Sequence, residues 1–299
     1  MSSKATITFH GKRQGFLMLF IGIFLAVLCM YGILAEKTET DLRPLTEAEA
    51  RMMDPEPDLL ILGDSIIALE RDNTTVADHI REITGLRVFN ACIGGTTGAS
   101  VNTGADSAVH QDAASLYYLQ KALIQKDFGT ILSENATECG GVEYEEVVFR
   151  RLQQVDLSKV KYLVLAYGTN DYFAGLMPYH REEPEDRYSY GCVLGMTVEA
   201  FRKAYPQMQV ILVTPKYCVI NGEECTEKSY GGGTLPDYVD AACRVGEDHN
   251  VPVIDMFYES GIDQENIMEM TGGDGLHLDA VGIDHYGRVL GEKLKEIIR

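Results

Sequence analysis

The chain has 299 residues, of which 45% are hydrophobic and 24% charged, so it has enough apolar material for a folded core and is not expected to be disordered. Its formal net charge at pH 7 is −19. Because binding to nucleic acid needs clustered lysine and arginine, this charge argues against nucleic acid as a partner, and it also opposes adhesion to anionic lipid through charge.

The first predicted element is a membrane-spanning helix at residues 15–35, preceded by a cytoplasmic segment at 1–14. The run has no charged residue and meets the roughly 20 residues that a helix needs to cross a bilayer. Lys4, Lys12 and Arg13 precede it and acids follow it, which places the N-terminus in the cytoplasm and the rest of the chain outside. A cleaved signal peptide, which would make the protein secreted, is the alternative. We favour an uncleaved anchor because the run exceeds the usual apolar segment of about 7 to 15 residues.

Residues 36–57 are predicted to form a stalk between the membrane and a folded domain. The segment is polar and contains prolines, and a short helix is possible around residues 46–53. The catalytic domain is therefore expected to span residues 58–299.

Strand-like and helix-like stretches alternate through this domain. Short runs rich in valine, isoleucine and leucine predict five buried parallel strands, at residues 59–62, 86–90, 162–166, 210–213 and 251–254. Helical patterns lie between and after them, at residues 76–83, 113–125, 144–154, 197–204, 235–248 and 280–298. The alternation predicts an α/β fold with helices on both faces of one sheet.

Polar motifs follow the first three strands. Gly63-Asp64-Ser65 comes after the first, Asn90 to Thr97 after the second, and Gly168-Thr169-Asn170-Asp171 after the third, while Asp274 and His277 lie near the C-terminus. Ligands of open parallel sheets bind beyond the carboxyl ends of the strands, so these residues are expected to gather there. Ser65 alone would more readily be a helix cap, but the whole set favours a nucleophile.

The set resembles the SGNH, or GDSL-type, family of esterases and lipases, whose four blocks carry Ser, Gly, Asn and His in this order. The resemblance covers about residues 58–299. It implies a three-layer α/β/α, flavodoxin-like fold with a mainly parallel five-stranded sheet and an active site at the carboxyl edge of the strands.

The chemistry that these residues suit is acyl transfer. Ser65 is a poor nucleophile until a base takes its proton, and neutral His277 is the matching base. Asp274, three residues before His277, can accept a hydrogen bond from Nδ1 and fix the tautomer. No cofactor is needed and no metal-ligand pattern is recognised, so neither is expected.

The family pattern also implies an oxyanion hole, made by the Ser65 amide, a glycine amide of the second block and the Asn170 side chain. Alignment places the glycine at Gly95, although Gly94 is adjacent and a shift by one residue is possible. Asp64 is expected to support the turn around the nucleophile without transferring a proton.

Several other residues carry open alternatives. His285 is the nearest rival to His277, but its expected position inside the terminal helix turns it away from the site. Cys218 and Cys225 flank an Asn-Gly turn and are equally consistent with a disulfide and with free thiols. The loop aromatics either contact a substrate or pack the loops onto the sheet; they are Tyr172, Phe173, Tyr179, Tyr188, Tyr190, Tyr217 and Tyr230.

The sequence therefore predicts an extracytoplasmic, membrane-anchored serine esterase that acts through an acyl-enzyme on a small-molecule or glycan ester. O-acetyl groups of a saccharide are the preferred substrate. An O-acyltransferase with the same Ser-His-Asp site is one alternative, and a glycan-binding module without turnover is another.

Overall fold

A computed structural model describes residues 44–68, 74–101, 113–133 and 144–298. The chain divides into two compact units, Met1–Pro44 and Leu45–Arg299, and the fold of the second carries the predicted catalytic domain. No helix within the described residues is long and apolar enough to cross a membrane. The expected cytoplasmic segment at 1–14 and membrane span at 15–35 lie outside the described residues.

The second unit is built on one sheet of five parallel strands in the order β2-β1-β3-β4-β7. The strands are β1 (Leu59–Gly63), β2 (Val88–Asn90), β3 (Tyr162–Ala166), β4 (Gln209–Val213) and β7 (Val253–Ile254). Every residue of β1 is buried. The predicted parallel sheet is confirmed, and the order is that of flavodoxin-like folds, with the switch in direction between β1 and β3.

Two strands are shorter than the apolar runs that predicted them. β2 starts at Val88 because the amides of Leu86 and Arg87 donate to the Thr84 hydroxyl and the Asp58 carboxylate instead of to a strand. β7 starts at Val253, since the Val251 amide donates to the carbonyl of Gly246 at the end of the preceding helix.

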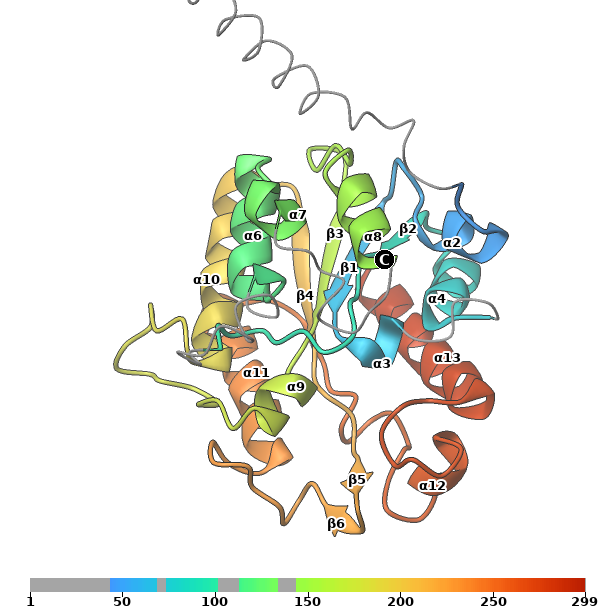
Figure 1. Cartoon of the computed structure of the whole chain (residues 1–299), viewed down its shortest axis with the longest axis vertical. Coiled ribbons are helices and arrows are strands. Elements are labelled where there is room, and N and C mark those ends of the chain that lie inside the picture. The colour runs from blue at the N-terminus through green and yellow to red at the C-terminus, as the bar shows by residue number, and fades with distance from the viewer. Residues whose placement is uncertain (1–43, 69–73, 102–112, 134–143, 299) are drawn as a thin grey trace, which may run out of the picture. The chain divides into compact units, whose positions relative to one another are not determined.

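Helices cover both faces of the sheet (Figure 1). The longer helices are α4 (Val76–Thr84), α6 (Leu116–Gln125), α8 (Tyr144–Leu152), α10 (Tyr190–Ala204), α11 (Leu235–His249) and α13 (Ala280–Ile297). Helices α4 and α13 pack on each other on one face, and α10 packs between α6 and α11 on the other. Short ones are α2 (Glu47–Met52), α3 (Ser65–Ala68), α7 (Gly129–Ser133), α9 (Thr169–Phe173) and α12 (Ile267–Met270).

Helix α10 begins seven residues before the predicted start at 197. Gly191 and Gly195 weakened the helical pattern there. Their place in the structure explains them: a Cβ on Gly195 would lie 2.8 Å from Nε2 of His249, and one on Gly191 would lie 2.7 Å from the Tyr179 ring. Close packing against two neighbouring segments thus outweighs the low helix propensity of glycine.

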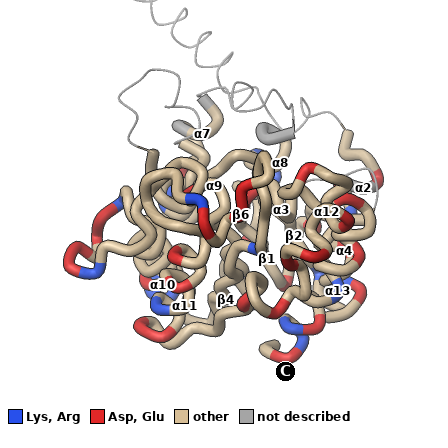
Figure 2. Tube along the Cα trace, turned by 90° about the horizontal axis from the view of Figure 1, so that it is seen from below, with Lys and Arg blue, Asp and Glu red and all other residues tan. Residues whose placement is uncertain are grey.

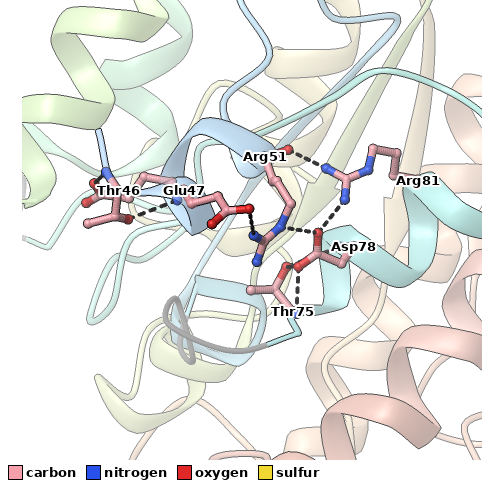
Figure 3. A network of polar contacts seen from close by, with 7 residues as sticks. Thr46, Glu47, Arg51, Thr75, Asp78 and Arg81 are labelled. Carbon is pink, nitrogen blue, oxygen red and sulfur yellow. Dashed lines mark hydrogen bonds and ion pairs between the residues drawn. The ribbon is translucent and has the colours of Figure 1, made fainter. Parts of the chain in front are cut away.

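The second half of the expected stalk at 36–57 lies, from Leu45 on, in the same compact unit as the sheet. Helix α2 starts with a capping box between Thr46 and Glu49, and Met52 is fully buried. Arg51 lies 3.5 Å from the Asp78 carboxylate of α4, which also pairs with Arg81 (Figure 3). The Arg51–Asp78 ion pair and the hydrogen bond from Arg81 to the carbonyl of Arg51 fix this helix to α4, which polarity and proline content alone did not reveal.

A two-stranded hairpin, β5 (Val219–Ile220) with β6 (Glu223–Glu224), follows β4. Its predicted Asn-Gly turn is confirmed by positive φ angles of 54° at Asn221 and 78° at Gly222. Cys218 and Cys225 meet at its base as free thiols, and the Cys218 amide donates to the sulfur of Cys225 at 3.3 Å. Of the disulfide and the free thiols that the sequence left open, the structure has the free thiols.

Candidate active site

The end of β1 positions Ser65. A Cβ on Gly63 would lie 2.6 Å from the carbonyl oxygen of Ala166 on the neighbouring strand, so only glycine fits there. Asp64 follows, and its Oδ1 accepts the amide hydrogen of Ile66 at 3.0 Å, which stabilises the turn into α3. Ser65 is the first residue of α3 and keeps partial exposure, while Asp64 beside it is buried.

The structure brings Ser65, His277 and Asp274 together in a chain of contacts. Oγ of Ser65 lies 3.2 Å from Nε2 of His277, across 212 residues of sequence. Nδ1 of His277 lies 3.0 Å from Oδ2 of Asp274. This is the order of contacts that a serine nucleophile, a general base and an orienting carboxylate require.

The loop of Asp274 and His277 is shaped by its own hydrogen bonds. Oδ1 of Asp274 accepts the amides of Leu276 at 2.6 Å and of His277 at 2.8 Å. Burial alone would raise the pKa of Asp274, but these amides and the His277 side chain lower it overall. One oxygen of the carboxylate therefore holds the loop, and the other is left for the imidazole.

Asn170 lies at the start of α9, the helix that follows β3. Its Nδ2 donates to the carbonyl of Thr96 at 2.9 Å, which links this helix to the loop after β2. An amide nitrogen carries two hydrogens, so one remains for a substrate oxygen.

Both glycines of the second block have a structural explanation. A Cβ on Gly94 would lie 3.6 Å from Cβ of Ser65, which places Gly94 beside the nucleophile. Gly95 has a φ of +75°, a conformation that other residues rarely adopt. Gly95 remains the predicted oxyanion donor and Gly94 the alternative.

Two fully buried carboxyl groups lie behind these residues. Burial raises the pKa of Asp64 to about 7 against the hydrogen bond from the Ile66 amide, and the charge of Asp171 raises it further. Burial also raises the pKa of Asp171 to about 6, although the amides of Ala99 and Gly98 donate to it, each at 2.8 Å. Asp171 thus ties α9 to the second loop, a role that its place in the sequence did not suggest.

Sequence reasoning missed Lys216, which follows β4 at the same edge and is 1% exposed. The predicted site draws on the loops after the first three strands and on the C-terminal loop, and the loop after the fourth strand carries no recognised motif. A lysine three residues after the fourth apolar run, at the position where the other loops carry functional groups, was the available indication.

The remaining candidates lie away from the nucleophile or are packed. His285 is on α13, and its Nε2 contacts the carbonyl oxygen of Ser260 at 2.6 Å, as its predicted helical position implied. Of the loop aromatics, Tyr172, Tyr190 and Tyr217 are buried, whereas Tyr230 is exposed. Packing therefore accounts for these three tyrosines.

Figure 2 views the molecule from the edge where these residues meet, with α3, α9 and α12 on that side. β6, which consists of two glutamates, adds negative charge there. In the described part of the chain, no group of three His, Cys, Asp or Glu side chains is arranged to hold a metal ion.

A parallel sheet that presents a serine, a histidine and an aspartate in hydrogen-bonding order defines a serine hydrolase type of site. The sequence profile of the GDSL-like lipase/acylhydrolase family matches residues 61–284, from β1 into α13. The chain belongs to this family and is a serine hydrolase.

Solved structures share the fold at low identity. A protein from Lactobacillus plantarum is 16% identical, with a TM-score of 0.53 over 80% of this chain and 95% of its own. A possible lipase from Chitinophaga pinensis is 14% identical, with a TM-score of 0.51 over 81% of this chain and 99% of its own. A search of curated proteins found no match.

Proposed function

We propose that this protein is an esterase in which Ser65 is the nucleophile, His277 the general base and Asp274 the residue that orients it. The observation that carries the proposal is the continuous path from Oγ of Ser65 to Nε2 of His277 at 3.2 Å and from Nδ1 to Asp274 at 3.0 Å. Both distances suit hydrogen bonds, and the lowered pKa of Asp274 keeps its carboxylate charged for this task.

The reaction runs in two halves. His277 takes the proton of Ser65 as Oγ bonds to the ester carbon, and the carbonyl oxygen becomes an oxyanion. Collapse breaks the bond to the alcohol, which leaves with the proton from His277, and an acyl-serine remains. Water then attacks with His277 again as base, and the acid and free Ser65 are released.

The oxyanion is stabilised by donors fixed before the reaction begins. In this proposal they are the Ser65 amide, the Gly95 amide and one hydrogen of Asn170 Nδ2. The other hydrogen of Nδ2 is donated to the carbonyl oxygen of Thr96. Loss of one such donor typically lowers kcat about 100- to 1,000-fold.

Hydrolysis is favoured over acyl transfer to a second alcohol. The His277 side chain is 38% exposed, so water reaches the base from which the second half-reaction starts. An acyltransferase has to keep water out of the acyl-enzyme, and an open histidine does not serve that purpose.

We further propose an outward-facing enzyme, held by the uncharged run at 15–35, that removes O-acetyl groups from saccharides. The basic residues before that run and the acids after it support the outward orientation. The net charge of −19 suits a neutral substrate better than an anionic one.

The test uses the purified full-length chain with p-nitrophenyl acetate and a fluorophosphonate label. Ser65→Ala should abolish both hydrolysis and labelling, while Ser229→Ala, in an exposed loop, should leave them unchanged. Full activity of Ser65→Ala would show that the nucleophile is wrong. Faster release of p-nitrophenol from the palmitate than from the acetate ester, with no release of acetate from acetylated saccharides, would refute the substrate class.

A further inference from the structure

Lys216 is the single buried lysine or arginine among the residues that the structure describes. Its Nζ donates to the carbonyl of Tyr217 at 3.1 Å. Moving an ammonium group out of water costs roughly several kcal/mol, unless nearby groups compensate for the lost hydration. A fold that buries this side chain therefore needs negative charge around it.

Lys216 shares a cavity with one acid, Asp64 of the nucleophile turn. Together with Asp64 and Thr169, it lines a small cavity of about 10 Å³, which is room for about one water molecule. The cavity lies beneath Ser65, because Asp64, Ile66 and Ile67 are in its wall. Tyr286 of α13 and Tyr167 after β3 close it.

The electrostatics point to the same arrangement. Burial lowers the pKa of Lys216 to about 8, and Cys218, Asp274, Cys225 and Asp64 oppose this shift. In return, Lys216 counteracts the rise that burial causes in the pKa of Asp64. The acids Asp64 and Asp274 thus favour the charged form of the lysine, against the effect of burial.

We propose that Lys216 is a positioning residue for the nucleophile turn, because its buried side chain lines the same small cavity as Asp64. It touches no reacting atom. Its charge favours the carboxylate form of Asp64, which holds the turn into α3. The inference rests on the proposed roles of Ser65, His277 and Asp274.

The first test compares Lys216→Met, which keeps the aliphatic stem, with Lys161→Met, which removes the same charge from an exposed ion pair with Asp58. For Lys216→Met we expect kcat to fall about tenfold with KM within about twofold. Loss of a nearby cation raises the pKa of a carboxyl group, so the acid limb of the kcat/KM profile should move up by about half a pH unit or more. Lys161→Met should keep the wild-type profile.

A Lys216→Met profile that superimposes on the wild type would overturn the proposal, even if the melting temperature falls, because a merely structural lysine affects stability alone. If Lys216→Met does not fold, NMR of protein with ¹³Cε-labelled lysine replaces it. The pKa of Lys216 should then fall in Asp64→Asn, because the negative charge that shares its cavity is removed. An unchanged pKa of Lys216 would overturn the proposal. This readout needs no turnover, so its failure is distinct from a failure of Ser65→Ala.

Discussion

The two halves of the candidate site are held in place by different means. Ser65, the proposed nucleophile, follows β1, whose residues are all buried, and its turn is closed by a buried aspartate. His277, the proposed base, is on a loop in which the Asp274 side chain is 47% exposed, and hydrogen bonds within the loop give it its shape. Substitutions near Ser65 should therefore affect folding first, whereas those near His277 should affect turnover first.

The largest effect is expected from Asp274→Asn, which tests the loop half. Asparagine keeps an oxygen for the amides of Leu276 and His277, but it presents an NH₂ group to Nδ1 of His277 and so favours the wrong tautomer. We expect kcat to fall about 1,000- to 10,000-fold. The melting temperature should change little, as measured by calorimetry beside the kinetic assay. A large loss of stability would mean that the Asp274 side chain also stabilises the rest of the fold, and not the histidine loop alone.

The next effect is expected from Gly63→Ala, which tests the nucleophile half. The new Cβ would lie 2.6 Å from the carbonyl oxygen of Ala166, and a backbone atom within the sheet cannot move aside cheaply. The free energy of unfolding should drop by about 2 to 3 kcal/mol in urea titration. Gly222→Ala is the control, because its Cβ meets no atom within 4 Å and only its φ of +78° is strained, at about 1 kcal/mol. Equal losses would contradict the packing argument.

Asp64→Asn tests the nucleophile half through the pH dependence of the protein's stability. Burial raises the pKa of Asp64 to about 7 in the folded protein, so the folded state binds a proton that the unfolded state releases above about pH 4. This group therefore contributes stability at low pH that is lost as the pH rises from about 4 to 7, on the order of 1.4 kcal/mol per pKa unit. Melting temperatures should show Asp64→Asn gaining on the wild type as the pH increases from 5 to 8. A constant difference would refute the raised pKa.

The smallest effect is expected from Thr271→Val. The Thr271 hydroxyl accepts the Gly275 amide at 3.0 Å and donates to the Ile267 carbonyl at 2.6 Å, so it connects α12 to the histidine loop. We expect a loss of about 1 kcal/mol in stability, and a severalfold drop in kcat. In Thr197→Val, where the hydroxyl donates to the Val193 carbonyl within α10, stability should fall similarly while kcat stays. Equal kcat values in the two variants would show that the Thr271 hydroxyl does not support the histidine loop.

The sequence was most informative where one local pattern determines the outcome. Runs rich in valine, isoleucine and leucine predicted all five parallel strands, and the Asn-Gly pair predicted the hairpin turn. It was least informative where distant segments meet. Nothing local to Gly195 indicates the imidazole of His249 that packs on it, and nothing local to Lys216 indicates a cavity shared with Asp64. The residues of the site were found because their spacing matched a family, and their roles remain predictions.

The attachment of α2 has a mechanical consequence. Leu45 enters the domain through a short helix pinned to α4 by Arg51, Asp78 and Arg81, and not through a strand of the sheet (Figure 3). A pulling force applied at this point would shear those contacts between helices before it loaded β1. We therefore expect the nucleophile turn to be shielded from tension on the preceding chain, with α2 detaching first.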